Sequence, residues 1–240
     1  AEHYNSPSIV MWVVFNEGWG QHDTQRYVDL VRQLDPTRWI GNASGWTDRQ
    51  CGDVIDLHSY PGPAMLPPEE HRASVLGEYG GLGLPLEGHT WVDKNNWGYV
   101  SFKDPKELTD QYVARIDQLR PLIAQGLSAA VYTQTTDVEV ECNGWLTYDR
   151  AVQKIDVARA AAATRKLYEP PGSLRTVVPT ALEAPQTWRW TTTDPGAGWE
   201  QPGFDDGSWE QGPGGFGSAG TPGARIGTDW KTDSIWLRRA

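Results

Sequence analysis

Two glutamates, Glu17 and Glu78, each close a short apolar segment and lie among glycines, in FNEGWG (15–20) and LGEYGG (76–81). Glutamate is a poor strand residue and is costly to bury, so its place at the end of an apolar run needs a reason. One reason is structural, since either carboxylate could cap a helix or form a surface ion pair. The other is chemical: cleavage of a glycosidic bond needs one protonated carboxyl group to assist the leaving oxygen and one ionised group to attack or to activate water.

The elements that must position these glutamates follow from the periodicity of the apolar residues. Short apolar segments predict strands, and segments with apolar residues three and four positions apart predict helices. The predicted strands are 8–15, 38–43, 53–60, 74–79 and 128–134, and the predicted helices are 23–34, 104–126 and 151–167. This alternation is typical of a parallel sheet flanked by helices, either an open doubly wound sheet or part of a barrel. In such folds the carboxyl ends of the strands carry the active site, and both glutamates lie there.

Three motifs resemble glycoside hydrolase family 2, the β-galactosidase and β-glucuronidase group. PSIVMWVVFNEGWG (7–20) is similar to the fourth barrel strand of that family, which ends in an Asn-Glu acid/base pair. LGEYGG (76–81) is similar to the seventh strand, which bears the nucleophile. DLHSYP (56–61) is similar to the sixth strand, whose tyrosine, here Tyr60, hydrogen-bonds the nucleophile. The resemblance therefore implies a retaining β-glycosidase.

The resemblance implies an incomplete (β/α)8 TIM barrel, with about strands 4 to 8 in residues 1–168. A barrel of this type takes about 250 residues. We therefore expect the N-terminal barrel strands in a longer parent chain, and little turnover from these 240 residues alone.

The composition changes after residue 168. Residues 169–185 are predicted to be a linker, and 186–240 contain six tryptophans with alternating stretches such as TWRWTTT (187–193). This pattern predicts antiparallel strands. The segment resembles part of a β-sandwich, a jelly-roll module of the galactose-binding kind.

A mechanism follows as a hypothesis. Glu17 would act as general acid and then as base, and Glu78 as the nucleophile of a covalent glycosyl-enzyme intermediate. Asn16 would hydrogen-bond the sugar 2-hydroxyl, and Trp19 would form an apolar wall that favours protonated Glu17. Retention requires carboxyl groups about 5 to 5.5 Å apart, and a gap above about 7 Å would contradict the nucleophile role of Glu78.

Further residues are candidates for substrate binding. Trp91 and Trp97, with Tyr99, lie in the long connection 80–103 and could stack on a sugar ring or merely fix the loop to the body. Tyr132 stands where the family usually places a tryptophan at the end of its eighth strand. His58 could orient a carboxylate, bind sugar, or be satisfied by a backbone carbonyl.

A group of acidic residues follows the last predicted strand of the barrel segment. Of Asp137, Glu139 and Glu141, with the neighbouring Trp145, we expect one or two to contact substrate and most to be solvated.

Composition excludes several partners. The net charge is −10 and the pI about 4.9, which disfavours nucleic acids and anionic membranes as partners. No apolar run approaches the roughly 18 residues of a membrane span. No metal-binding or cofactor-binding motif is present, so we expect a carbohydrate substrate and neither metal nor cofactor. The sequence does not decide the cellular compartment, and an extracytoplasmic or secreted location is compatible with it. It also does not decide whether Cys51 and Cys142 pair.

Three alternatives to this hypothesis stay open. The first is a carbohydrate-binding protein that does not cleave its ligand. The second is a structural or assembly role for the tryptophan-rich segment. The third, within the enzymes, is another barrel glycosidase with two glutamates, of the cellulase or mannanase type. The sequence does not name the sugar or the linkage.

Overall fold

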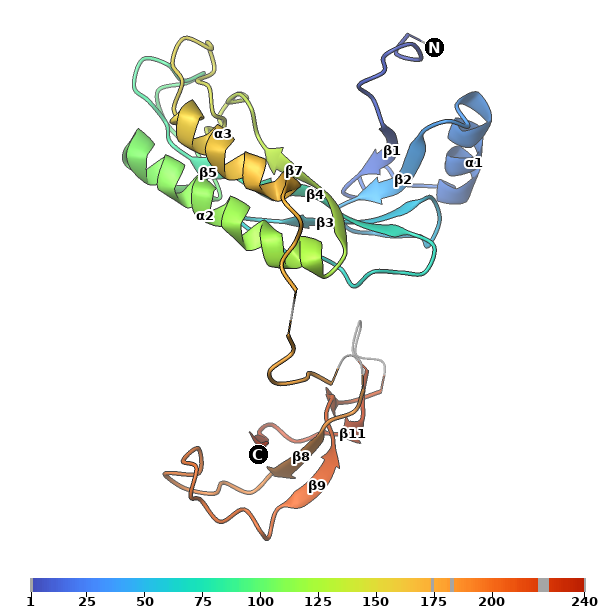
Figure 1. The fold of residues 1–240 in the computed structure, drawn as a ribbon, viewed down its shortest axis with the longest axis vertical. Helices are drawn as coiled ribbons and strands as arrows, with labels where there is room; N and C mark the ends of the chain where they lie inside the picture. Colours follow the sequence, from blue (N-terminus) through green and yellow to red (C-terminus); the bar gives the residue numbers. More distant parts are fainter. Residues whose placement is uncertain (1, 174, 182–183, 220–224, 240) are drawn as a thin grey trace. The chain divides into compact units, whose positions relative to one another are not determined.

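The computed structural model describes residues 2–173, 175–181, 184–219 and 225–239. The chain divides into two compact units, residues 1–174 and 175–240, and the boundary falls inside the predicted linker. Figure 1 shows the helices and the parallel strands in the first unit and only short strands in the second.

The first unit alternates strands and helices as the sequence predicts. Its elements are β1 (Met11–Asn16), α1 (Thr24–Leu34), β2 (Trp39–Ser44), β3 (Val54–Ser59), β4 (Ala73–Gly80), β5 (Leu82–Gly83), β6 (Val100–Ser101), α2 (Pro105–Ala124), β7 (Leu127–Thr133), α3 (Val157–Arg165) and a short 3-10 helix, η1 (Lys166–Tyr168). The five predicted strands correspond to β1, β2, β3, β4 and β7, within a few residues at each end.

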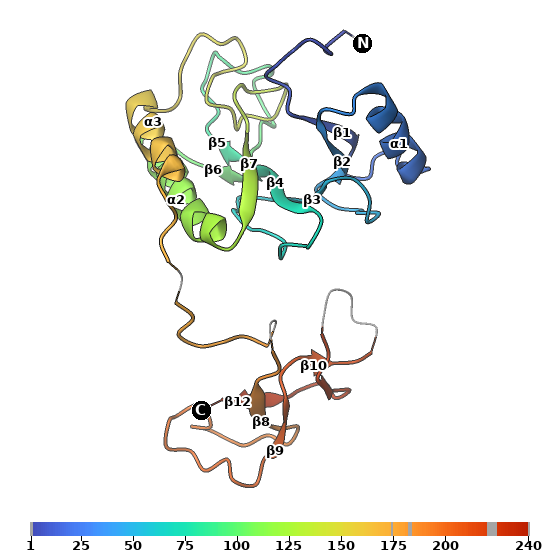
Figure 2. The ribbon, with the colours of Figure 1, turned by 45° about the vertical axis from the view of Figure 1, so that its right-hand side comes forward.

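The long strands are parallel, as expected. β1 pairs with β2, and β4 lies between β3 and β7. β2 and β3 are neighbours without a continuous ladder, so the strands form two sheets. Figure 2 shows β1, β2, β3, β4 and β7 in a row, with α1 beside one end and α2 and α3 beside the other. Among the described residues this row of strands does not close into a barrel. The fold class of the first unit is therefore α/β, with an open arrangement of parallel strands.

The main core lies between the three-stranded sheet and the pair α2 and α3. Leu76 and Leu82 from the strand side meet Leu108 and Ile116 of α2, and all four are fully or almost fully buried. Burying each leucine contributes about 1.5–3 kcal/mol. A smaller cluster of Val28, Ile40 and Cys51 lies under α1. The larger core therefore fixes the sheet that carries Glu78.

The third helix is shorter than predicted. The sequence predicts 151–167, but α3 begins at Val157, where Asp156 caps it by accepting a hydrogen bond from the Arg159 backbone nitrogen at 3.1 Å. The residues before α3 form backbone hydrogen bonds with an earlier part of the chain, such as the one that Lys154 N donates to Trp145 O at 2.7 Å. The reason is that the Lys154 side chain is drawn into a buried ion pair, which an alanine-rich helical pattern does not reveal.

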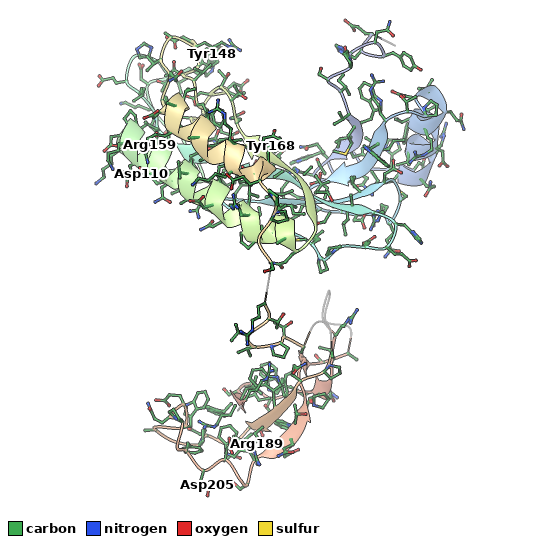
Figure 3. The ribbon with its side chains drawn as sticks, viewed as in Figure 1. Asp110, Tyr148, Arg159, Tyr168, Arg189 and Asp205 are labelled. Atoms are coloured by element: carbon green, nitrogen blue, oxygen red, sulfur yellow. The ribbon has the colours of Figure 1, made fainter. Side chains whose placement is uncertain are left out.

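The second unit contains the predicted antiparallel strands. β8 (Thr187–Thr191) lies between β9 (Glu210–Pro213) and β12 (Trp236–Arg238), and β10 (Phe216–Gly217) pairs in parallel with β11 (Thr228–Asp229). Figure 3 shows its side chains around Arg189 and Asp205. In the described part of this unit no large apolar side chain is buried. The antiparallel sheet is therefore confirmed, and the jelly-roll assignment stays a prediction.

None of the helices in the described ranges has the length and apolar character needed to cross a lipid bilayer.

Candidate active site

Glu17 follows the last residue of β1 and begins a tight turn. Its backbone nitrogen donates to Ser44 O on β2 at 3.0 Å, which continues the β1 to β2 pairing by one step. Glu17 and Gly18 then adopt left-handed conformations, with φ of 53° and 74°. The strand thus fixes where Glu17 starts, and the turn presents its side chain at the carboxyl edge of the sheet.

His58 on β3 and Glu78 on β4 are paired in register, after a bulge between Leu57 and His58. The His58 side chain is 1% exposed, whereas those of Glu17 and Glu78 are 21% and 30% exposed. Its Nδ1 lies 2.8 Å from Glu17 Oε1 and 3.3 Å from Glu78 Oε2. This geometry supports one of the three roles predicted for His58, in which it orients a carboxylate.

The two glutamates meet around this imidazole. The nearest ligand atoms of Glu17, His58 and Glu78 all lie within 4.8 Å of one another. The glutamate oxygens therefore lie well inside the limit of about 7 Å above which Glu78 could not act as a nucleophile. An imidazole nitrogen and two carboxylate oxygens are also ligand types for a divalent cation, so this group is where a metal would bind in the described chain.

Tyr60 donates its hydroxyl proton to Glu78 Oε2. Burial, followed by this hydrogen bond, holds the pKa of Tyr60 above its ordinary value, so the tyrosine remains a donor. The Tyr99 ring stacks on Tyr60, with centroids 3.8 Å apart and planes 3° from parallel. A glycine is needed beside this stack, because a Cβ at Gly81 would lie 2.3 Å from Tyr99 Cδ2.

Asp56 lies behind His58 and was not singled out from the sequence. Its Oδ1 accepts from the backbone nitrogens of Gly45 at 3.2 Å and Gly77 at 3.1 Å, and lies 3.8 Å from His58 Nε2. Burial raises the pKa of Asp56. The signal that could have found it is the strand period of two, which places residues 56 and 58 on the same face of β3.

Of the two residues that flank the Glu17 turn, only Trp19 takes a position different from the one expected. Asn16 Oδ1 accepts from Ser44 Oγ at 2.7 Å, so Asn16 is oriented at the edge of the site. Trp19 is 78% exposed and does not enclose Glu17, because the turn after β1 directs it into solvent. The aromatic ring that does approach is Trp46, which follows β2, is 51% exposed and packs edge-on to His58 with centroids 5.8 Å apart.

Of the two loop tryptophans, Trp97 is the one connected to the cluster of Glu17, His58 and Glu78. It is 42% exposed, and its ring packs edge-on to Tyr99 with centroids 5.2 Å apart. Trp91 packs instead against Tyr148, which is labelled in Figure 3, with ring centroids 4.8 Å apart. Trp97 therefore extends the aromatic surface that starts at Tyr60, and Trp91 lies against a different loop.

Tyr132 is not brought to the glutamates. Tyr132 pairs with Tyr79 on β4, and the side chain of Tyr79 faces the side of that strand opposite to its neighbour Glu78. The Tyr132 ring packs among Tyr79, Tyr112 and Trp145. Burial raises the pKa of Tyr132. The role of Tyr132 is thus in the helix-facing core, and the expectation of sugar contact is corrected.

The expectation that most acidic residues after β7 are solvated also needs correction. Asp137 is 2% exposed and pairs with the fully buried Lys154. Glu139 is exposed, as expected, and Glu141 is partly buried. Trp145 packs on Tyr112 with centroids 5.1 Å apart, in the core.

Comparison with known proteins identifies one family. Residues 1–69 match the family described as glycosyl hydrolases family 2, TIM barrel domain. The matched segment contains β1, α1, β2 and β3 with Glu17, His58 and Tyr60, while Glu78 lies beyond it. A search of curated proteins finds no match. The resemblance seen in the sequence is therefore confirmed for residues 1–69.

Proposed function

Because residues 1–69 match the TIM barrel domain of glycosyl hydrolase family 2, we propose that this chain carries the reaction centre of a retaining β-glycosidase. The observation that supports this most strongly is the approach of the Glu17 and Glu78 carboxylates, which lie around His58 with all three ligand atoms within 4.8 Å. The substrate class is a β-linked glycoside, of the β-galactosidase or β-glucuronidase type.

In the first step Glu78 attacks the anomeric carbon as the bond to the leaving oxygen breaks. Glu17 donates its proton to that oxygen, and the sugar becomes an ester of Glu78. In the second step Glu17, now ionised, removes a proton from water, and the resulting nucleophile displaces Glu78 from the anomeric carbon. Two inversions leave the configuration unchanged.

The neighbouring residues support these roles. Tyr60 donates to Glu78, which favours the ionised carboxylate and directs its other oxygen toward the sugar. His58 lies 2.8 Å from Glu17 and 3.3 Å from Glu78, so one nitrogen orients both carboxylates. Asn16 accepts a hydrogen bond from Ser44, and in this mechanism Asn16 hydrogen-bonds the sugar 2-hydroxyl. Trp46 offers an exposed ring beside His58 for stacking on sugar.

The open arrangement of the strands sets the expected rate. Among the described strands β1 pairs only with β2, and these strands do not surround the site. Catalysis depends on exclusion of water and on fixed positions of the reacting groups. We therefore expect slow turnover from the 240-residue chain, and measurements should use activated substrates.

The test separates the acid role of Glu17 from simple damage to the site. Dinitrophenolate leaves without a proton, whereas methylumbelliferone or an alcohol needs one. With Glu17→Gln we expect the first release of dinitrophenolate from β-gluco, galacto, manno and glucurono substrates to change little. Release of the poorer leaving groups should fall by about 10²- to 10⁴-fold.

Glu139→Gln is the matched control, because Glu139 is an exposed carboxylate outside the site. It should leave both kinds of release unchanged. An equal loss of both in Glu17→Gln would contradict the acid role. Binding of sugars by the unaltered chain without any release would support the alternative of a non-catalytic carbohydrate-binding protein.

A further inference from the structure

A chain of hydrogen bonds in the segment after β7 ends on a carboxylate that the proposed mechanism does not use. Gln134 Nε2 donates to Asn143 Oδ1 at 2.6 Å, and Asn143 Nδ2 donates to Glu141 Oε1 at 2.7 Å. Asn143 is fully buried, while Glu141 is partly exposed. Among the described residues, Asn143 alone donates to the Glu141 side chain, so one carboxylate oxygen is fixed and the other is open to a ligand.

A buried ion pair holds this segment in place. Lys154 Nζ donates to Asp137 Oδ1 at 2.6 Å, and to the carbonyl oxygens of Leu84 and Cys142 at 3.0 Å each. Gly144 N donates to the same Asp137 oxygen at 2.8 Å. Because Cys142 lies between Glu141 and Asn143 in the chain, the lysine fixes the backbone from which both side chains extend.

The same segment is paired with the aromatic surface of the reaction centre. Trp97 N donates to Val140 O at 2.9 Å, and Cys142 N donates to Trp97 O at 2.7 Å. The Trp97 ring contacts Tyr99, which stacks on Tyr60, the partner of Glu78. A continuous path of contacts therefore joins Glu141 to the nucleophile.

Tyr99 is 48% exposed. Burial, and then the negative charges of Glu141, Glu17 and Glu78, raise the pKa of Tyr99. The geometric link between Glu141 and these aromatic residues is the isolated bridge that joins the backbones of Trp97 and Glu141.

We propose that Glu141 and Trp97, with Tyr99, form a second sugar-binding subsite that takes a sugar unit next to the one cleaved between Glu17 and Glu78. A fixed carboxylate with a free oxygen accepts hydrogen bonds from sugar hydroxyls, and an exposed aromatic face stacks on the apolar face of a pyranose. The location of the cleaved sugar rests on the proposed function. The subsite makes a β-linked oligosaccharide, rather than a simple glycoside, the preferred ligand.

The test measures binding of oligosaccharides in a Glu78→Gln background, which prevents turnover. The probes are β-1,4-linked disaccharides and trisaccharides in the gluco, galacto and manno series, each compared with its methyl β-monosaccharide by titration calorimetry. Adding Glu141→Gln should weaken oligosaccharide binding about tenfold, the loss expected for one hydrogen bond to a charged group. Monosaccharide binding should be unchanged.

Two further variants serve as a control and as a second test of the subsite. Glu139→Gln, an exposed carboxylate of the same segment, should leave both affinities unchanged. Trp97→Ala removes the stacking face from a half-exposed position and should weaken oligosaccharide binding without lowering the melting temperature greatly. Glutamine at 141 retains the acceptor for Asn143, so Glu141→Gln is expected to fold.

The outcomes separate this inference from the proposed function. Release of dinitrophenolate together with oligosaccharide binding that Glu141→Gln does not weaken would overturn the subsite and leave the hydrolase intact. Weakened oligosaccharide binding in a chain that never releases dinitrophenolate would support the subsite and count against the hydrolase. Equal losses for mono- and oligosaccharides, or no saccharide binding at all, would overturn the subsite.

Discussion

The proposed reaction centre and the segment of residues 134–155 are positioned in different ways. Glu17, His58 and Glu78 stand on or directly after β1, β3 and β4, so parallel backbone pairing decides where each side chain begins. The segment 134–155 has only isolated bridges and depends on the Lys154–Asp137 pair in its interior. Strand ends can therefore bring polar side chains together through local pattern alone, whereas a loop needs a specific buried contact to fix the positions of its polar residues.

The largest expected effect comes from breaking that buried contact. Lys154→Met leaves Asp137 buried without its partner, and should lower the free energy of unfolding by about 3–5 kcal/mol. Burial alone lowers the pKa of Lys154 and raises that of Asp137, and the hydrogen bond between them opposes both effects. Urea unfolding followed by circular dichroism measures the loss.

Two additional variants make this prediction more specific. Lys154→Met with Asp137→Leu removes both charges and should recover most of the stability, because no unpaired charge remains. Lys106→Met removes an exposed lysine, 2.7 Å from Asp110 and 81% exposed, and should cost less than about 1 kcal/mol. Similar losses for Lys154→Met and Lys106→Met would show that residues 134–155 do not depend on the buried pair.

A smaller effect is expected on the strand side of the comparison, at Asp35. This buried residue accepts from Trp12 Nε1 on β1 at 2.9 Å, from Thr37 Oγ1 at 2.6 Å and from Arg38. The Thr37 hydroxyl, then Trp12 and Arg38, hold the pKa of Asp35 far below its ordinary value of 3.8. A lowered folded-state pKa contributes stability above the unfolded-state value and loses it as the pH falls.

Asp35→Asn should therefore be less stable than the unaltered chain at neutral pH. The difference should stay constant down to about pH 5 and then shrink as the pH falls further. Asparagine keeps one oxygen acceptor, so the loss should be smaller than that of Lys154→Met. Urea unfolding of the Asp35→Asn variant and of the unaltered chain, from pH 7 to pH 3, measures this difference in stability. A difference that does not change over this range would show that ionised Asp35 does not hold β1 to the loop before β2.

The sequence predicts the strands, two helices and the meeting of Glu17 with Glu78, because these follow from short-range periodicity and from the rule that parallel strands end at one edge. It does not predict the Lys154–Asp137 pair, since two charged residues in an irregular segment carry no periodic signal. The same pair explains why α3 starts late. The resemblance offers Tyr132 as a substitute for the tryptophan that the family usually has at this strand end, but which face of β7 Tyr132 takes depends on its pairing with Tyr79.

The most direct measurement of the central claim is the identity of the residue that becomes glycosylated. Activated 2-deoxy-2-fluoro β-glycosides of the gluco, galacto, manno and glucurono series form slowly hydrolysed esters with a retaining nucleophile, and peptide mapping by mass spectrometry locates them. The predicted result is one adduct, on Glu78, formed by at least one of the four sugars and lost in Glu78→Gln. An adduct on Glu17 or on any other residue, or no adduct with any of the four, would contradict the assignment of Glu17 and Glu78 as the acid/base and nucleophile.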